Sequence, residues 1–345
     1  MRIALVNDVM AAVEAMRRVV LSTRDHQVAW IARDGSEALD LCASDAPDLI
    51  LMDLIMPGMG GVEATRRIMA RTPCAIVVVT ANVTDQSGKV FEAMGAGALD
   101  AVNTPVLERT GGCDGARALL AKIDTIRRLI GPDVGKDHPA PAQPITRHPG
   151  QHHNHLIGIG ASAGGPTALA SVLAHLPADF PAPVIIVQHV DPHFAEGLAN
   201  WLNGQTPLHV RLAREGDHPQ AGTALLAGQE NHLVFASPTR LVYTRHPAGC
   251  SYRPSIDLFF ESADRFWPGD VVGVLLTGMG RDGAEGLRAL HASGHHTIAQ
   301  DRPSSAVYGM PGAAAELRAA TEILSLDKIG PRLTNIVVQK MKPHG

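Results

Sequence analysis

The sequence predicts an α/β protein with two doubly wound parallel-sheet domains. Its 345 residues are enough for two domains. Short apolar runs alternate with segments of helical periodicity, and such β-α units place helices on both faces of a parallel sheet. This alternation stops over residues 131–153, where prolines and histidines accumulate. Because proline-rich chain stays extended and packs poorly, we expect a linker there, with domains at 1–130 and 154–345.

In the first domain, strands are expected at short apolar runs and helices where apolar residues recur every three to four positions. The expected strands are Ile3–Val6, Val28–Ala32, Asp48–Met52, Ala75–Thr80 and Leu99–Val102. The expected helices are Ala11–Leu21, Ser36–Ser44, Val62–Ala70, a segment that includes Lys89–Met94, and Asp114–Ile130. Units of this length form one doubly wound parallel sheet.

The second domain repeats this alternation around three apolar runs. We expect buried parallel strands at Leu156–Ile159, Val184–Val187 and Val271–Leu276. Helices are expected at Pro166–Leu176, Phe194–Leu202 and Ala284–Ala292, and a β-hairpin or meander over His232–Arg245.

The composition excludes several classes of protein. The net charge of −4 and the pI of about 6.5 argue against nucleic acid or an anionic membrane as the main partner. The chain has no apolar run of the length that spans a bilayer, so we expect no membrane insertion. The first apolar run is too short for a signal peptide, and the four cysteines are widely spaced without a C-x-x-C pair. Both features predict a cytoplasmic protein with reduced thiols.

Polar residues end or follow four of the expected strands in the first domain. Asn7-Asp8, Asp53, Thr80 and Thr104 should therefore meet at the carboxyl edge of one sheet, where such folds bind ligands. Two carboxylates at that edge repel each other unless a cation lies between them, and oxygen ligands favour Mg²⁺. Because a metal neutralises developing charge, the neighbouring carboxylate becomes a plausible phosphoryl acceptor.

In the second domain, Ser162, His189 and Asp282 each follow an expected strand. They should emerge along one sheet edge, and together they are the nucleophile, base and orienting carboxylate of a serine hydrolase. Ser162 lies within a G-x-S-x-G pattern at a strand-to-helix turn. Backbone N–H groups at the start of the next helix could stabilise an oxyanion there.

Two other interpretations of the serine segment remain open. Gly158, Gly160 and Ala163 meet the loose G-x-G-x-x-G/A dinucleotide pattern, but the next strand ends in Gln188-His189 and not in an acidic residue. The triad order of α/β-hydrolases, Ser, Asp, His, could instead pair Asp282 with a later histidine. The later histidines are His291, His295 and His296, in the following helix or just before a strand.

Each member of the triad also has an ordinary explanation on its own. Ser162 or Asp282 could simply cap a helix, and His189 could be a hydrogen-bonded histidine at a strand end. Their joint occurrence after strands and in glycine-rich turns favours catalysis.

The segment Met1–Ile130 resembles the response-regulator receiver domain, which is flavodoxin-like. The resemblance rests on the run Asp53-x-x-Met56-Pro57-Gly58, on Thr80 after the fourth strand and on the Gly95–Ala98 turn. It implies that Asp53 accepts phosphate from a histidine kinase and that Thr80 is the switch hydroxyl. It also implies Mg²⁺ bound by Asp8, Asp53 and the Ile55 carbonyl.

Three positions depart from the receiver pattern. Asn7 replaces a usual acid, Thr104 replaces a lysine, and Ala101 replaces a common aromatic residue. The first two changes remove one negative and one positive charge, so the local net charge is kept. We expect Asp53 still to be phosphorylated, with altered coupling; the alternative is a receiver that serves only for docking or as an inhibitory cap.

The second domain resembles the chemotaxis-type protein-glutamate methylesterase family, CheB. The matching runs are Ile159–Pro166, Val187–His189, Leu275–Ala284, Gln300-Asp301 and Val307–Pro311. A receiver tethered in front of this domain is the architecture of that family. Ala163 stands where the family often has threonine.

This resemblance implies hydrolysis of glutamyl methyl esters, and deamidation of selected glutamines, on a methyl-accepting chemoreceptor. It implies Ser162 as nucleophile, His189 as base and Asp282 as orienting carboxylate, with backbone amides at Ala163 and Met279 in the oxyanion hole. No metal is expected at this second site.

Details of the first domain also resemble a particular branch of the family. The segments Val6–Asp8 and Leu99–Pro105 are most similar to the Wsp-type branch, whose methylesterase adapts a surface-sensing receptor that governs cyclic-di-GMP production. Two other functions remain as alternatives: a non-enzymatic adaptor that docks on a receptor or kinase, and a serine hydrolase of other small esters.

Overall fold

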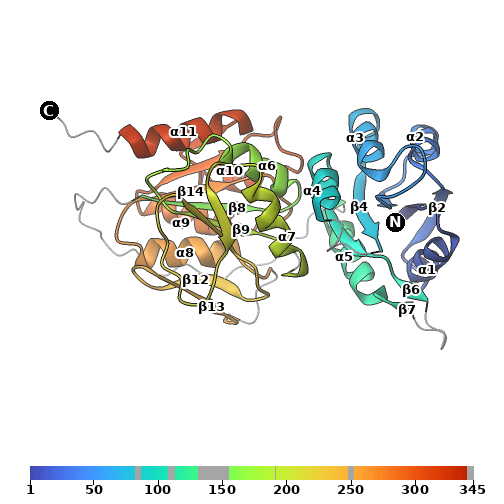
Figure 1. Cartoon of the computed structure of the whole chain (residues 1–345), viewed down its shortest axis with the longest axis horizontal. Helices are drawn as coiled ribbons and strands as arrows, with labels where there is room; N and C mark the ends of the chain where they lie inside the picture. Colours follow the sequence, from blue (N-terminus) through green and yellow to red (C-terminus); the bar gives the residue numbers. More distant parts are fainter. Residues whose placement is uncertain (82–86, 108–112, 131–154, 191, 248–251, 340–345) are drawn as a thin grey trace. The chain divides into compact units, whose positions relative to one another are not determined.

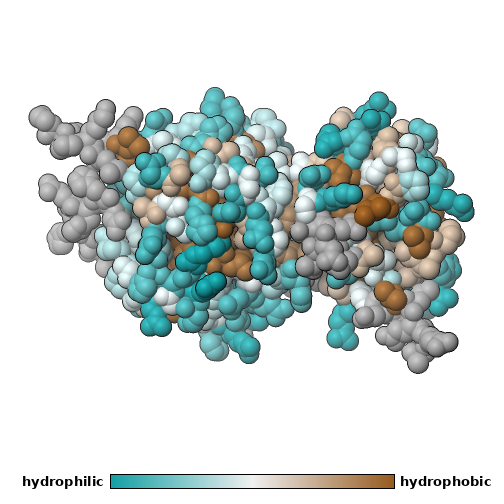
Figure 2. Space-filling model, in the orientation of Figure 1, coloured by the Kyte–Doolittle hydropathy of each residue, from teal (hydrophilic) through white to brown (hydrophobic). Residues whose placement is uncertain are grey.

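The structure, a computed structural model, describes residues 1–81, 87–107, 113–130, 155–190, 192–247 and 252–339. The chain divides into two compact units, Met1–Asp137 and His138–Gly345 (Figure 1). The predicted linker lies outside the described residues. Within the described ranges, no helix is both long and apolar enough for a membrane span. Hydrophilic residues cover much of the face shown in Figure 2, with hydrophobic residues between them in small groups.

The first unit is built on a five-stranded parallel sheet of order β2-β1-β3-β4-β5, which confirms the predicted doubly wound fold. Its strands are β1 (Arg2–Val6), β2 (Gln27–Ala32), β3 (Leu49–Met52), β4 (Ala75–Thr80) and β5 (Asp100–Asn103). One face carries α1 (Met10–Leu21) and α5 (Ala116–Ile130), and the other carries α2 (Gly35–Ser44), α3 (Gly61–Arg71) and α4 (Ser87–Gly95) (Figure 1). The strand order reverses between β1 and β3, so residues that follow these two strands border the ligand-binding crevice of such sheets.

A short antiparallel strand pair precedes the last helix of this unit. The helix therefore begins later than predicted. Asp114 was expected to begin the helix, but it lies in β7 (Cys113–Asp114), which pairs with β6 (Val106–Leu107). The helix begins only at Ala116. Two-residue strands leave no periodicity in the sequence, which explains the error.

The second unit contains a seven-stranded parallel sheet of order β10-β11-β9-β8-β14-β15-β16. Its strands are β8 (Leu156–Ala161), β9 (Val184–Gln188), β10 (His209–Leu212), β11 (Thr223–Leu226), β14 (Val271–Leu275), β15 (His296–Gln300) and β16 (Glu322–Leu324). The expected hairpin is present as an antiparallel pair, β12 (His232–Ser237) and β13 (Arg240–Thr244). The order reverses between β8 and β14, and sheets of this kind bind ligands at the carboxyl ends of the strands beside such a reversal.

Helices cover both faces of this sheet. One group comprises α6 (Gly165–Leu173), α7 (Pro192–Asn203) and α11 (Leu326–Gln339), and the other α8 (Ile256–Phe266), α9 (Ala284–Ala292) and α10 (Met310–Glu316) (Figure 1). The helix predicted to reach Leu176 ends at Leu173, since Pro177 disfavours helical backbone in the residue before it and cannot donate a hydrogen bond itself.

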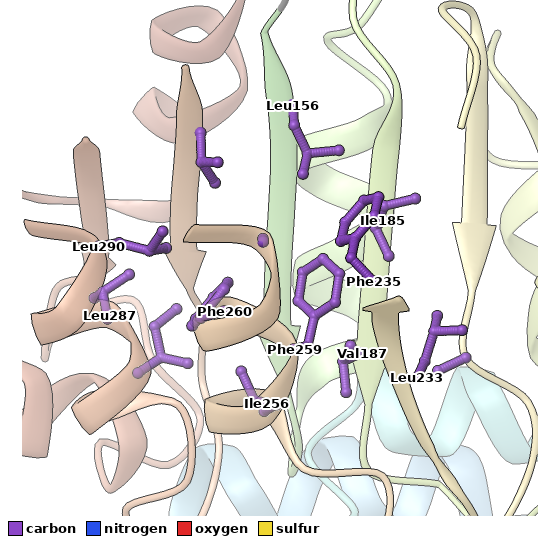
Figure 3. Packing of buried hydrophobic residues seen from close by; sticks show 14 of the residues in the cluster. Leu156, Ile185, Val187, Leu233, Phe235, Ile256, Phe259, Phe260, Leu287 and Leu290 are labelled. Atoms are coloured by element: carbon purple, nitrogen blue, oxygen red, sulfur yellow. The ribbon is translucent and has the colours of Figure 1, made fainter. Parts of the chain in front are cut away.

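Helix α8, which the sequence analysis did not predict, is central to the core of the second unit. Its apolar side chains recur at helical spacing and are fully buried: Ile256, Phe259, Phe260 and Ala263. Figure 3 shows Ile256, Phe259 and Phe260 packed over β8, β9 and β14, and Ala263 belongs to the same buried cluster. Burial of each of the three larger side chains, those of Ile256, Phe259 and Phe260, contributes roughly 1.5–3 kcal/mol.

Two glycines of β8 let α8 come close to the sheet. A Cβ atom on Gly158 would lie 2.8 Å from Phe259 Cε1, and one on Gly160 would lie 2.4 Å from Ile256 Cγ2. Side chains at these positions would push the helix away. The approach matters because the first turn of α8 borders the candidate site.

Candidate active site

The three predicted catalytic segments meet at the carboxyl edge of the second sheet. Ser162 follows β8, which lies between β9 and β14. The Ser162 amide donates to the Thr277 carbonyl at 3.1 Å, and the His189 amide donates to the Ala161 carbonyl at 3.0 Å. Neighbouring strand ends therefore hold the serine next to both the histidine turn and the loop that carries Asp282.

The imidazole of His189 is joined to Asp282. Its Nε2 lies 2.8 Å from Asp282 Oδ2, and its ring stacks on Tyr252 with centroids 4.8 Å apart and planes 3° from parallel. The Nδ1 atom is buried and has no hydrogen-bond partner among the described residues. Nε2 therefore faces the carboxylate, and Nδ1 is the nitrogen left to accept a proton. Ser162 Oγ is not hydrogen-bonded to it in this state.

Asp282 is held by the first turn of α8. Its Oδ1 accepts from Ser255 Oγ at 2.9 Å, and its Oδ2 accepts from the Ile256 amide at 2.7 Å. Burial acts to raise the pKa of Asp282, but the hydrogen bond and charge of His189, together with these two donors, hold that pKa below its usual value. The carboxylate stays ionised and fixes the orientation of the imidazole.

A second carboxyl group lies beside Asp282. Burial, reinforced by the negative charge of Asp282, raises the pKa of Asp257. Asp257 Oδ1 accepts from the Gly286 amide at 2.7 Å, which ties α8 to α9. The pair therefore favours one charged and one protonated carboxyl, with the charge on Asp282.

The backbone after Ser162 makes a tight turn into α6. The Gly165 amide donates to the Ser162 carbonyl at 2.8 Å, and Gly164 has φ +74° and ψ 0°, the values of the third residue of a type II turn. Glycine suits this left-handed position. In the described part of the chain, neither the Ala163 amide nor the Met279 amide donates to another protein group, so both are available for an oxyanion.

The geometry disfavours both alternative interpretations of the serine segment. Gly158 and Gly160 face the side chains of α8 and leave no space there for a phosphate group. His295 Nδ1 accepts from the Val271 amide at 3.1 Å, and His296 Nε2 lies 2.8 Å from Glu322. Both histidines thus lie at the amino edge of the sheet, away from Asp282, while His291 is exposed in the last turn of α9.

The predicted acceptor of the first unit, Asp53, directly follows β3. Its side chain is 8% exposed, and its Oδ1 accepts from the Leu54 amide at 2.7 Å. Burial raises the pKa of Asp53 to about 6, and the charge of Asp8 acts in the same direction. The buried Asn7 accepts a hydrogen bond from the Val9 amide at 2.8 Å, so it caps the start of the loop after β1.

The remaining receiver residues lie along the same edge. The Thr104 amide donates to the carbonyl of the buried Thr80 at 2.9 Å, which joins the ends of β4 and β5. Ile55, two residues after Asp53, is half exposed. Across the described ranges, no three His, Cys, Asp or Glu side chains are grouped as metal ligands. Asp8 and Asp53 nevertheless interact unfavourably, and this repulsion is what a hard divalent cation would relieve.

The sequence did not predict the structural roles of three residues of the second site: Tyr252, Ser255 and Gln188. A signal for Ser255 was present, because it precedes an apolar pattern of helical spacing, as an N-cap does. No sequence signal identifies Tyr252 as the partner of His189, since their stacking depends on the loop between β13 and α8.

Comparisons with known proteins agree with this division into two units. Residues 3–110 match the response regulator receiver domain family, and residues 157–333 match the CheB methylesterase family. A protein-glutamate methylesterase/protein-glutamine glutaminase of Burkholderia lata is 57% identical over 334 residues, which cover 96% of this chain and 98% of that protein.

Further relatives extend the similarity. A protein of the same description from Mesorhizobium japonicum is 56% identical over 336 residues, covering 96% of this chain and 98% of its own. The crystal structure of the Thermotoga maritima CheB methylesterase catalytic domain is similar with a TM-score of 0.51 and 31% identity, over 53% of this chain and 98% of that one.

Proposed function

Because this chain belongs to the CheB methylesterase family and carries a response regulator receiver domain, we propose that it hydrolyses glutamyl methyl esters on a methyl-accepting chemoreceptor. Deamidation of selected glutamines on the same receptor belongs to the proposal, since both reactions pass through the same acyl-enzyme. The observation that carries it is the 2.8 Å contact between His189 Nε2 and Asp282 Oδ2, beside Ser162.

In the proposed mechanism Ser162 Oγ attacks the ester carbonyl while His189 Nδ1 accepts its proton. Asp282 keeps the ring oriented and stabilises the imidazolium. The amides of Ala163 and Met279 stabilise the oxyanion. The imidazolium then protonates the leaving methoxide, methanol departs, and water attacks the glutamyl-enzyme with His189 as base.

The receiver unit supplies regulation in this proposal. Asp53 accepts a phosphoryl group from a histidine kinase in the cytoplasm, and Thr80 acts as the switch hydroxyl. Asp8, Asp53 and the Ile55 carbonyl would hold Mg²⁺, which neutralises charge on the transferring phosphoryl group. The segments Val6–Asp8 and Leu99–Pro105 support placing the chain in the Wsp-type branch, and coupling would differ at the substituted positions Asn7 and Thr104 within them.

The proposal is tested by methanol release from a methylated receptor fragment. The full chain should release methanol, and Ser162→Ala should lower the rate by about 10³-fold or more, as triad substitutions do. Ser171→Ala, which changes a serine in α6 away from the sheet edge, is the matched control and should retain the wild-type rate.

The other outcomes separate the alternatives. Hydrolysis of small methyl esters with no methanol from the receptor would favour a small-ester hydrolase. A wild-type rate in Ser162→Ala would exclude the serine mechanism. Receptor binding without any hydrolysis would favour the adaptor.

A further inference from the structure

Gln188, the last residue of β9, connects the two turns that carry the nucleophile and the base. Its side chain is fully buried. Its Nε2 donates to the Ser162 carbonyl at 2.9 Å and to the His189 carbonyl at 3.0 Å. A single amide group therefore fixes the backbone at both catalytic side chains.

The amide of Gln188 has one sensible orientation. Reversal would place Oε1 against two carbonyl oxygens, and like partial charges would repel. In the observed orientation Oε1 is buried without a hydrogen-bond partner among the described residues. It packs against the backbone of Gly165, where a Cβ atom would lie only 1.9 Å from Oε1. A buried acceptor left unpaired lowers stability, so its presence beside the nucleophile calls for a functional explanation.

The peptide that Gln188 binds is also the one that carries the Ala163 amide. The Ser162 carbonyl and the Ala163 N–H belong to the same planar trans peptide, so they point in opposite directions. The carbonyl accepts from Gln188 Nε2 and from the Gly165 amide at 2.8 Å. Two donors on the oxygen fix the plane of the peptide and polarise it, which aims the N–H outward and strengthens it as a donor.

We infer that Gln188 is a positioning residue that aims the Ala163 amide at the oxyanion while holding the backbone of His189. It acts through the Ser162–Ala163 peptide and does not touch the substrate. The inference rests on the proposed esterase function. The buried side-chain amide of Gln188 thus aligns the oxyanion donor, the Ala163 amide, with the base, His189.

The test is steady-state methanol release from the methylated receptor fragment, at varied fragment concentration, by the full chain and by Gln188→Met. Methionine has a similar length but no donor. Loss of an oxyanion donor typically lowers kcat by about 10²–10³-fold, and a misaimed donor loses part of this. We expect kcat to fall at least about tenfold with KM within about twofold of wild type, because ground-state binding does not use the oxyanion contact.

Gly165→Ala provides a second variant that keeps Gln188 itself. The new methyl group would occupy the position of Oε1 and displace the amide, while alanine favours the helix that begins there. The same split between kcat and KM is expected.

Thr206→Val is the matched control. Its hydroxyl donates to the Leu173 carbonyl at 2.8 Å, before β10 and thus at the amino edge of the sheet. It should lower the melting temperature without changing kcat.

Three results would overturn the inference: wild-type kcat in folded Gln188→Met, a proportional loss in Thr206→Val, or a rise in KM that accounts for the whole effect. A measurement on the wild-type protein tests the inference even if the variants do not fold. The side-chain NH₂ protons of Gln188 should exchange with solvent as slowly as core amides, and rapid exchange would contradict the hydrogen bonds. An inactive wild-type chain would instead count against the proposed function.

Discussion

Asp282 lies where helix α8 begins, and donors from two sides converge on it. Ser255 Oγ and the Ile256 amide approach from the helix, and His189 Nε2 approaches from β9. The amide groups of a first helical turn are otherwise unsatisfied, and the helix dipole favours negative charge there. The same interactions that stabilise the fold thus keep Asp282 ionised, as its proposed role beside His189 requires.

The neighbouring Asp257 yields a prediction on stability. Burial raises its pKa above the unfolded value, so over the interval between the two pKa values the folded state holds a proton that the unfolded state has lost. The contribution of the Asp257 carboxyl to the free energy of unfolding is therefore lost as pH rises from about 4 through the raised pKa. Asp257→Asn should flatten the fall in free energy of unfolding over that interval, as measured by urea denaturation at several pH values.

The control for this measurement is Asp179→Asn, which changes an exposed carboxylate and should leave the pH dependence unaltered. An unchanged slope in Asp257→Asn would mean that Asp257 is ionised in the folded protein.

Most residues that the sequence could identify lie at or directly after the end of an apolar strand, whereas Asp282 lies further along the loop after β14. Ser162, His189 and Asp53 stand at such positions, and parallel strands bring their carboxyl ends to one edge. Tyr252 and Asp257 have no such marker, because their roles arise from the way a loop and a helix pack on other elements. The sequence shows that Asn7 stands where the receiver pattern has an acid. It does not show that the Asn7 side chain accepts a hydrogen bond from the Val9 amide.

Among the helices and strands, those with a clear local pattern were predicted more completely than those without one. The strands nearest the centres of both sheets are continuous apolar runs and were all expected. Helix α8 was missed, although Ser255 and the spacing of Ile256, Phe259 and Phe260 fit an N-cap and a buried helical face. Edge strand β16 is only three residues long and partly exposed, too short for any periodicity.

The contact between α8 and β8 yields a prediction at this scale. In Gly158→Ala the new Cβ would lie 2.8 Å from Phe259 Cε1 and 3.2 Å from Phe260 Cε1. Overpacking of this kind typically costs about 1–3 kcal/mol, and it would also shift the helix start that binds Asp282. We expect a lower free energy of unfolding in urea and a lower kcat.

Gly204→Ala serves as the control, because the new Cβ of this exposed residue would meet only the carbonyl oxygens of Trp201 at 3.4 Å and Asn200 at 3.9 Å, which are ordinary contacts. If both variants were as stable as wild type, α8 would not pack against β8 as described.

At the scale of the whole molecule, two parallel sheets carry at their carboxyl edges the residues proposed for two different chemistries. The first places Asp8 and Asp53 on either side of its reversal point, and the second places Ser162 at its own. The proposal that the first edge regulates the second needs phosphorylation of Asp53.

A small-molecule phosphodonor tests this link. Acetyl phosphate with Mg²⁺ should raise the rate of methanol release from the receptor fragment by the full chain. Asp53→Asn or removal of Mg²⁺ with EDTA should abolish the increase, because the acceptor or the charge-neutralising ion is then lost. Asp40→Asn, an exposed carboxylate in α2, should respond as wild type does. Stimulation that survives in Asp53→Asn would place the effect elsewhere.

The proposed esterase activity depends most on one step, in which His189, held by Asp282, activates Ser162. Peptide mapping by mass spectrometry after treatment with a fluorophosphonate measures this directly. We predict one covalent adduct on Ser162 in the full chain and its near absence in His189→Gln. An adduct on another residue, or equal labelling of Ser162 in His189→Gln, would contradict the account.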